Sequence, residues 1–315
     1  MKKFLSVLAT LPFLASPVFA SDRLSGAGAT FPSPLYTRWF RNYYKETGNR
    51  VNYQATGSGS GIRQFFGNTL DFGASDDPIT KDSSDLIQIP ITAGAVVPAY
   101  NKPGCDLKIT QFQLADVYLG KITDWKDLGC ESGKITPIFR SDGSGTTAVF
   151  TASLAVFSPE WELKVGHGKS VQWPIGIGSK GNAGVAGSIK QTPGAIGYLN
   201  YSYVRGGKQQ EADIQNKAGN YVKATKDNTI AGLSEVQLDD RLIGTNSNPA
   251  GDNSYPIISY TWILARPEHP KNDAMKRVFK YMLKKSSQDL ADTLGYIPLP
   301  ESIRLKCLET VEFLK

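Results

Sequence analysis

The stretch ITPIFRSDGSGTTAVFTASLAVF, residues 135–157, decides the fold. It opens with β-branched and aromatic residues from Ile135 to Phe139, which predict a strand. The next segment, Arg140 to Thr146, mixes glycine with hydroxyl residues, and the apolar run from Thr147 to Phe157 predicts a helix. A strand that leads through a glycine-rich loop into a helix is the repeating unit of α/β proteins with mostly parallel sheets.

Similar loops occur twice earlier in the chain, at Gly26–Phe31 (GAGATF) and Thr56–Gly61 (TGSGSG). Glycine lets the backbone approach a ligand, hydroxyl groups donate hydrogen bonds, and the N-terminus of a helix presents free N–H groups at the positive end of its dipole. One such loop is an ordinary helix cap. Three of them, with Arg140 beside the third, predict an anion-binding site.

The rest of the pattern agrees with an α/β architecture, in which strands alternate with helices. Thr110 and Gln113 form the sequence pattern of a capping box for a helix that runs through Tyr118. Two extended apolar segments, Pro90–Asn101 and Tyr255–Arg266, are candidates to carry the chain between two lobes. The polar stretch Gly206–Asn253 suits an elaborated edge or long loops. The other expected elements are helices over Pro34–Gly48, from Gly61 onward and over Met275–Leu283, and strands over Val51–Thr56 and Asp71–Ser75.

The composition excludes several classes of protein. Of 315 residues, 40% are hydrophobic, and after the first twenty residues no apolar run approaches the roughly 20 residues that a membrane span needs. The net charge is +6 with no block of five like charges, so no nucleic-acid partner is expected. His167 and His269 have no neighbours at ligand spacing, and no metal or other cofactor is expected.

The first twenty residues predict a secretory signal peptide. A positive start at Met1–Lys3 is followed by the apolar stretch Phe4–Leu14, and Val18 and Ala20 supply the small residues of a cleavage site. No cysteine follows the apolar stretch to accept a lipid. We expect an exported, periplasmic protein that is cleaved after Ala20.

Export makes disulfides admissible. Cys307 belongs to an apolar stripe at helical spacing, which is typical of a buried thiol. The favoured disulfide is therefore Cys105–Cys130, although sequence alone leaves the other pairings open.

Enzymatic patterns are missing from the glycine-rich loops. None ends in the Gly-Lys-Ser/Thr of a nucleotide P-loop, and neither Ser58 nor Ser144 stands in Gly-x-Ser-x-Gly. Asp76 and Asp77 form either a metal-binding pair or a turn before Pro78, and composition favours the turn.

Six motifs stand in order along the chain: Ser25–Pro34 (SGAGATFPSP), Glu46–Gln54 (ETGNRVNYQ), Asp71–Asp76 (DFGASD), Asp116–Ile122 (DVYLGKI), Asp142–Thr146 (DGSGT) and Pro193–Leu199 (PGAIGYL). Together they resemble one family, the phosphate-binding proteins of bacterial high-affinity phosphate ABC transporters. The resemblance runs from about Leu24 to Tyr203, thins through the polar stretch and returns at Tyr255–Leu264.

The resemblance implies a fold of two hinged α/β lobes, each a mostly parallel sheet flanked by helices, with phosphate held between them. The expected division is a signal peptide at 1–20, lobe I at 21–98 and 257–315, and lobe II at 99–256. It also implies that Asp142 supports the site by pairing with Arg140. The phosphate-binding residues that it implies are Thr30, Phe31, Ser58, Asp76, Arg140, Ser144, Gly145 and Thr146.

The same resemblance implies a monomeric binding protein, not an enzyme, that passes inorganic phosphate to the membrane permease of an ABC importer. Asp76 would accept the proton that phosphate still carries near neutral pH and that sulfate lacks. Asp77 departs from the small neutral residue expected there; it would either raise the pKa of Asp76 or face solvent. The alternatives are an exported phosphatase-like enzyme, which needs a nucleophile beside a base or a metal pair, and a binding protein for another oxyanion.

Overall fold

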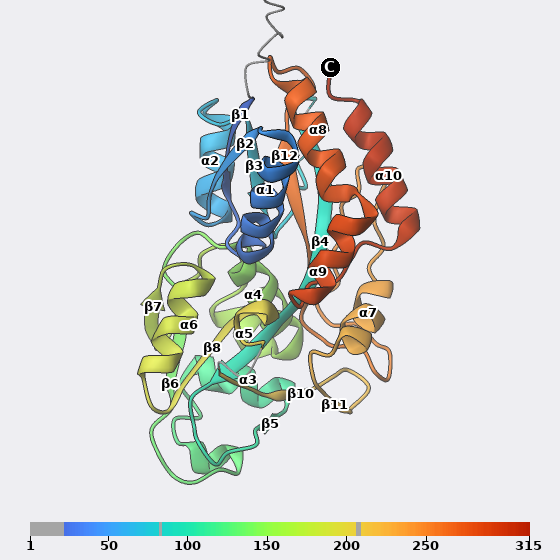
Figure 1. Cartoon of the computed structure of the whole chain (residues 1–315). Coiled ribbons are helices and arrows are strands. Elements are labelled where there is room, and N and C mark those ends of the chain that lie inside the picture. The colour runs from blue at the N-terminus through green and yellow to red at the C-terminus, as the bar shows by residue number, and fades with distance from the viewer. Residues whose placement is uncertain (1–21, 82–83, 206–208) are drawn as a thin grey trace, which may run out of the picture.

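The computed structural model of the chain describes residues 22–81, 84–205 and 209–315. The expected signal peptide and its cleavage site lie outside these ranges. None of the described helices is long and apolar enough to cross a membrane. The described residues form two α/β lobes that are stacked along the long axis of the molecule (Figure 1).

Lobe I is built on three parallel strands and the returning strand β12, which is antiparallel to β3. Its central strand β1 lies between β2 and β3, so the three strands end at the same edge of the sheet. The elements of lobe I are β1 (Arg23–Gly28), α1 (Ser33–Thr47), β2 (Arg50–Gln54), α2 (Ser58–Phe66), β3 (Phe72–Ser75), β12 (Ile258–Ala265), α8 (Asn272–Leu283), α9 (Lys285–Thr293) and α10 (Glu301–Glu312).

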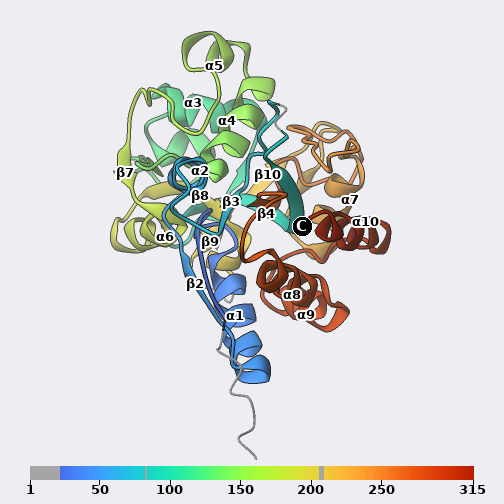
Figure 2. The same cartoon turned by 90° about the horizontal axis from the view of Figure 1, so that it is seen from above.

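Lobe II is built on the parallel strands β6, β7 and β8, with helices around them. In the view from above, α6 and α10 lie on opposite flanks of the molecule (Figure 2). The elements of this lobe are β5 (Lys108–Ile109), α3 (Gln111–Leu119), the 3₁₀ helix η1 (Trp125–Leu128), β6 (Thr136–Arg140), α4 (Gly145–Phe157), α5 (Pro159–Lys164), β7 (Ile177–Ser179), α6 (Gly181–Gln191), β8 (Ala195–Asn200), η2 (Tyr201–Tyr203), β9 (Gln210–Glu211), β10 (Asp213–Gln215), β11 (Tyr221–Val222) and α7 (Lys226–Ser234).

One long strand, β4 (Ile87–Tyr100), joins the lobes. It pairs antiparallel with β12 up to Ala95 and antiparallel with β8 from Val96 onward. The main strands of both lobes therefore belong to one nine-stranded sheet, which β4 crosses from lobe to lobe (Figure 1). The short strands β5, β10 and β11 form a separate three-stranded sheet in lobe II. The expected α/β fold is confirmed. Parallel pairing is kept for the outer strands, while the strands that connect the lobes run antiparallel.

Most expected elements are present, with ends that shift by a few residues. The capping box of α3 is formed by Thr110 and Gln113 as expected. Helix α4 begins at Gly145, two residues before the expected start, because the Ser144 hydroxyl accepts the backbone N–H of Thr147 and caps the helix. The stretch Gly206–Asn253 contains the short strands β9, β10 and β11. It also contains a helix, α7, which the weak hydrophobic periodicity of this stretch did not predict.

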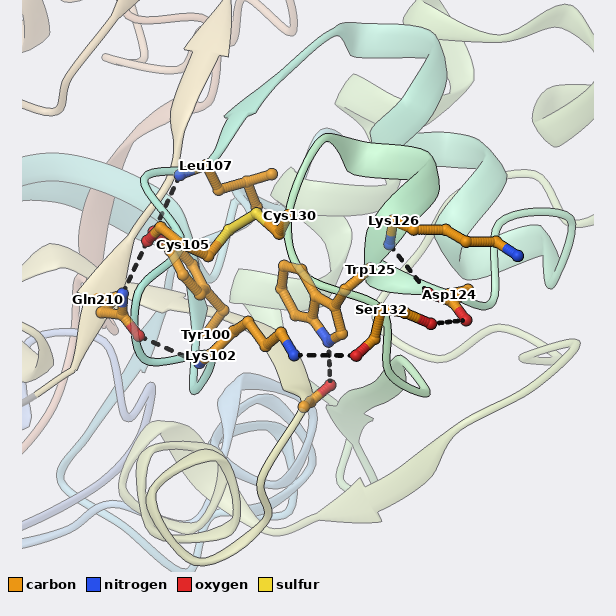
Figure 3. Close-up of a disulfide and its surroundings, with 11 residues drawn as sticks. Tyr100, Lys102, Cys105, Leu107, Asp124, Trp125, Lys126, Cys130, Ser132 and Gln210 are labelled. Carbon is orange, nitrogen blue, oxygen red and sulfur yellow. Dashed lines mark hydrogen bonds between the residues drawn. A yellow bond between two sulfur atoms is a disulfide. The ribbon is translucent and has the colours of Figure 1, made fainter.

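The predicted disulfide between Cys105 and Cys130 is present, and Cys307 is free and buried. The bridge ties the loop after β4 to the turn after η1, next to the buried ring of Trp125 (Figure 3). The Tyr100 hydroxyl donates to the Cys105 carbonyl at 2.9 Å, which fixes the loop on the other side of the bridge. In the chain-entropy model, a disulfide that closes a loop of this length stabilises the fold by about 3 kcal/mol.

Candidate anion-binding site

The eight expected binding positions converge where the two lobes meet. Each lies at the carboxyl end of a strand or at the first turn of the following helix, as expected for ligand sites in parallel sheets. All eight are buried. Thr30 and Phe31 lie between β1 and α1, Ser58 begins α2, Asp76 follows β3, Arg140 ends β6, Ser144 caps α4, and Gly145 and Thr146 begin α4.

Direct contacts across the lobes bring these positions together. The Thr146 hydroxyl of lobe II donates to Asp76 Oδ2 of lobe I at 3.2 Å. Gly145 packs so closely that a Cβ atom there would lie 2.6 Å from Ser58 Oγ and 2.8 Å from Asp76 N. Only glycine lets the first turn of α4 approach lobe I to this distance.

Backbone N–H groups of both lobes face the site. The first residues of α4 have no carbonyl four residues earlier in the helix to bind, so their N–H groups are free to donate. The hydroxyl of Tyr203, in lobe II, donates to the Thr30 carbonyl of lobe I at 2.7 Å. The described peptide bonds are trans, so the Phe31 N–H points away from Tyr203. These groups supply donors at the positive end of a helix dipole.

Arg140 supplies the charge of the site, and Asp142 holds it in place. Arg140 Nε donates to Asp142 Oδ1 at 2.8 Å, and Nη2 donates to Oδ2 at 2.5 Å. Burial alone would raise the pKa of Asp142, but the hydrogen bonds and charge of Arg140, with the Gly181 N–H, hold it below its usual value. The remaining nitrogen, Nη1, is buried and donates to none of the described residues. It is a charged donor that the protein itself leaves unused.

The hydroxyl groups of two serines are oriented as donors. Ser58 Oγ accepts the N–H of Asp76 at 3.3 Å, and Ser144 Oγ accepts the N–H of Thr147 at 3.0 Å. A hydroxyl has one hydrogen, and a backbone N–H can only donate, so each serine keeps its own hydrogen for another acceptor. Fixed donors of this kind suit an anion.

Asp76 is the exception among these donors. It is fully buried, and desolvation raises its pKa to about 7, against the opposing effects of the Thr261 hydrogen bond, the charge of Arg140 and the Thr146 hydrogen bond. Thr261 Oγ1 donates to Asp76 Oδ1 at 2.9 Å, while Thr146 occupies Oδ2. Because desolvation outweighs these contacts, this carboxyl group exchanges its proton near neutral pH.

Asp77 agrees with the first of the two alternatives raised by the sequence, an effect on the pKa of Asp76, and does not simply face solvent. Its side chain is one-third exposed and forms an ion pair across the cleft with Lys169 of lobe II. Its charge is also the smallest of the contributions that raise the pKa of Asp76. Lys169 further accepts the Ser144 N–H with its carbonyl at 2.8 Å, which ties the ion pair to the cap of α4.

Sequence reasoning missed two residues of the site, Asn182 and Thr261. Asn182 follows Gly181 at the start of α6, where a strand again leads through a glycine into a helix, so the pattern of the three earlier loops could have identified it. Thr261 lies inside β12 and carries no such signal, because threonine is common in strands.

The arrangement can hold a buried tetrahedral anion. Hydroxyl and N–H donors from both lobes lie with the unpaired Arg140 Nη1 and the carboxyl group of Asp76 where the lobes meet. Among the described residues, no group of three or more His, Cys, Asp or Glu side chains gathers as a metal site. His167 is exposed, whereas His269 is mostly covered and lies near Asp71 rather than standing free on the surface.

Comparison with known proteins shows which family the chain is similar to. A family model described as a PBP superfamily domain matches residues 16–286. The phosphate-binding protein PstS of Pasteurella multocida is 38% identical, over 90% of this chain and 88% of the relative. PstS of Haemophilus influenzae is 37% identical over 96% of each chain. The structure is similar to that of a phosphate-binding protein from Stenotrophomonas maltophilia, with a TM-score of 0.69 and 20% identity over 92% of this chain and 94% of the other.

Proposed function

This chain belongs to the family of PstS phosphate-binding proteins, and we propose that it captures inorganic phosphate between its two lobes and delivers it to an ABC importer. The observation that carries the proposal is the presence of one carboxylate, Asp76, in a buried site made otherwise of donors. A site for a fully ionised anion would not contain it, because acceptor would face acceptor.

The proton of the ligand resolves this conflict. Phosphate groups have a second pKa of roughly 6, so the dianion of inorganic phosphate still carries one hydrogen near neutral pH. Asp76 accepts that hydrogen when it is ionised. Sulfate has no hydrogen to offer, and a site that requires one can reject such an analogue by about 10⁴–10⁵.

We assign the remaining groups as donors to the phosphate oxygens. Arg140 provides its free Nη1, and Asp142 acts only by orienting the guanidinium group. Charge-assisted bonds from one arginine, together with neutral N–H and hydroxyl donors, compensate the dianion without an excess of positive charge. The neutral donors are the hydroxyl groups of Thr30, Ser58 and Ser144 and the backbone N–H groups of Phe31, Gly145 and Thr146.

The lobes act as a hinged clamp in this proposal. Lobe I comprises residues 21–98 and 257–315, lobe II comprises residues 99–256, and β4 and the segment before β12 form the hinge. Neither half of the site satisfies the anion alone, so phosphate favours the closed arrangement by its differential affinity. Small-angle scattering should show a smaller radius of gyration when phosphate is saturating.

The proposed cellular role follows from the family. The protein is exported to the periplasm, works as a monomer and presents its closed form to the membrane permease of the importer. It performs no chemistry on the ligand, in keeping with relatives that are named as binding proteins rather than as phosphatases.

Calorimetric titration with phosphate, sulfate and arsenate tests the proposal. Phosphate should bind with an affinity suited to scavenging, and sulfate should give no measurable heat at the same concentration. Arsenate has the same protonation pattern as phosphate and serves as the matched control for shape and charge. Tight binding of sulfate, or no binding of phosphate, would contradict the proposed function.

A further inference from the structure

Asn182 connects the two lobes at the centre of the anion site. It is the second residue of α6 in lobe II and is fully buried. Its side-chain Nδ2 lies 2.7 Å from Thr30 Oγ1 of lobe I and 3.2 Å from Thr146 Oγ1 of lobe II. Its backbone N–H also donates to Thr30 Oγ1, at 3.1 Å.

The chemistry of its neighbours fixes which way the Asn182 amide points. The backbone N–H of Asn200 donates to Asn182 Oδ1 at 2.9 Å. A backbone N–H can only donate, so the atom that faces Asn200 must be the oxygen. The NH₂ group therefore faces the two threonine hydroxyls, and each hydroxyl oxygen accepts one of its hydrogens.

This orientation determines what the Thr30 hydroxyl can do. Its oxygen receives two hydrogens, one from the backbone of Asn182 and one from its side chain, which occupies both lone pairs. The hydroxyl can then act only as a donor, with its hydrogen directed to a third group. Thr146 is affected in the same sense, because it accepts from Asn182 and passes its own hydrogen to Asp76.

We propose that Asn182 is a positioning residue that turns the Thr30 and Thr146 hydroxyls into donors, and that it does so for Thr30 only when the lobes meet. This inference rests on the proposed function and deepens it. Thr30 and Asn182 belong to different lobes, so closure creates the donor that the phosphate oxygen needs. While the lobes stay open, Asn182 does not contact Thr30, and the hydrogen of the Thr30 hydroxyl is not directed to the anion.

Two substitutions at one position separate this role from simple packing. Asn182→Asp keeps the size and shape but offers only acceptors, so both threonine hydroxyls turn to it and away from their partners. Phosphate affinity should fall about 100-fold or more, since a donor is lost and an unpaired negative charge is added. Asn182→Ala only frees the hydroxyls and should weaken phosphate binding about 10-fold. If Asn182 only filled space, Asn182→Ala would weaken phosphate binding more than Asn182→Asp does.

A double-mutant cycle with Thr30→Val tests whether Asn182 acts through the Thr30 hydroxyl. Removal of the Thr30 hydroxyl should reduce the penalty of Asn182→Asp to well under its single-variant value, because the two changes disrupt one interaction. The buried amide of Asn216, which follows β10 and donates to the Asp252 carbonyl at 2.8 Å, provides a matched control. Asn216→Ala should lower the melting temperature of the ligand-free protein and leave phosphate affinity unchanged.

The experiment is calorimetric titration of phosphate into wild type and the variants, with melting of each ligand-free protein. The expected result is an Asn182→Asp protein that melts close to wild type but binds phosphate more weakly than Asn182→Ala does. An Asn182→Asp protein that binds as well as Asn182→Ala, or better, would overturn the inference alone. Wild-type protein that binds no phosphate would overturn the proposed function and this inference together.

Discussion

The two ends of β3 carry buried aspartates with opposite acid–base behaviour. At the start of the strand, Asp71 accepts the N–H of Ser25 at 2.7 Å and pairs with Lys271 Nζ at 3.0 Å. These contacts hold the pKa of Asp71 below its usual value, although burial by itself would raise it. At the other end, the carboxyl group of Asp76 accepts hydrogen bonds from the hydroxyl groups of Thr146 and Thr261, and burial raises its pKa to about 7.

The difference shows that burial and the partners of a carboxyl group together decide its charge at neutral pH. An ammonium group and a backbone N–H keep Asp71 ionised and structural. Asp76 is the more deeply buried of the two, and its hydroxyl partners do not offset the cost of desolvation, so it can gain or lose a proton near neutral pH. One strand thus holds a fixed structural charge at one end and a proton-sensing carboxyl group at the other.

Asp76→Asn should give the largest effect on anion binding, because it removes the carboxyl group that accepts the proton of the ligand. The amide can turn its NH₂ group toward an anion oxygen, so sulfate affinity should rise by about 100-fold or more, part of the 10⁴–10⁵ that such a site can reject. Phosphate exchanges one hydrogen bond for another and should change far less. Competition titration measures both. If sulfate competes no better than against wild type while phosphate still binds, Asp76 is not the proton acceptor.

Arg140→Ala should give the next largest effect and should not discriminate between anions. It removes the buried Nη1 donor and leaves Asp142 without its partner. With about 1.5–3 kcal/mol for a hydrogen bond to a charged group, phosphate affinity should fall at least tenfold and closer to 100-fold. Calorimetry on Arg140→Lys provides the control that keeps charge but loses the planar fork. An affinity within about threefold of wild type would remove Arg140 from the site.

Asp71→Asn tests the structural end of the strand through stability rather than binding. The pKa of Asp71 is lowered in the folded state, so its contribution is present at neutral pH and is lost as the pH falls through the folded value. The variant should lose about 1–3 kcal/mol of unfolding free energy at pH 7. Urea unfolding of the phosphate-free proteins should show that this difference disappears in strong acid, while phosphate affinity stays unchanged. A difference that persists in acid would mean that the charge of Asp71 is not what stabilises the fold.

Lys169→Ala should give the smallest effect. The Asp77–Lys169 pair joins the lobes but is about one-third exposed on each side, and such pairs contribute about 0–1 kcal/mol. Phosphate affinity should fall less than about fivefold at low salt, and the difference should vanish in high salt. Lys164, which pairs with Glu160 inside lobe II at 2.8 Å, is the control, and Lys164→Ala should leave affinity unchanged. A loss that is independent of salt would point to a role other than charge.

The sequence was informative where local chemistry repeats. Glycine and hydroxyl residues before a helix identified the loops at Thr30, Ser58 and Ser144, because those residue types are needed there whatever the rest of the fold does. The apolar stripe around Cys307 favoured the Cys105–Cys130 disulfide, which the structure contains. These features depend on a few neighbouring residues.

Features that depend on distant partners could not be read in the same way. Thr261 looks like an ordinary strand residue until the sheet brings β12 beside β3. The opposite behaviour of Asp71 and Asp76 depends on Lys271, which lies 200 residues beyond Asp71, and on which hydroxyls close over Asp76. The helix α7 lies in a polar stretch with weak periodicity, where contacts with β12 and β4 rather than an apolar stripe support it.

The ionisation of Asp76 tests the central claim most directly. The carboxyl ¹³C signal of Asp76, assigned by its loss in Asp76→Asn, can be followed by NMR as the pH is changed. In the ligand-free protein it should titrate near its pKa of about 7, well above that of Asp71. With phosphate bound at pH 8 it should report an ionised carboxylate that accepts a hydrogen. A signal that titrates below pH 5 without ligand, or that stays protonated with phosphate bound, would contradict the account.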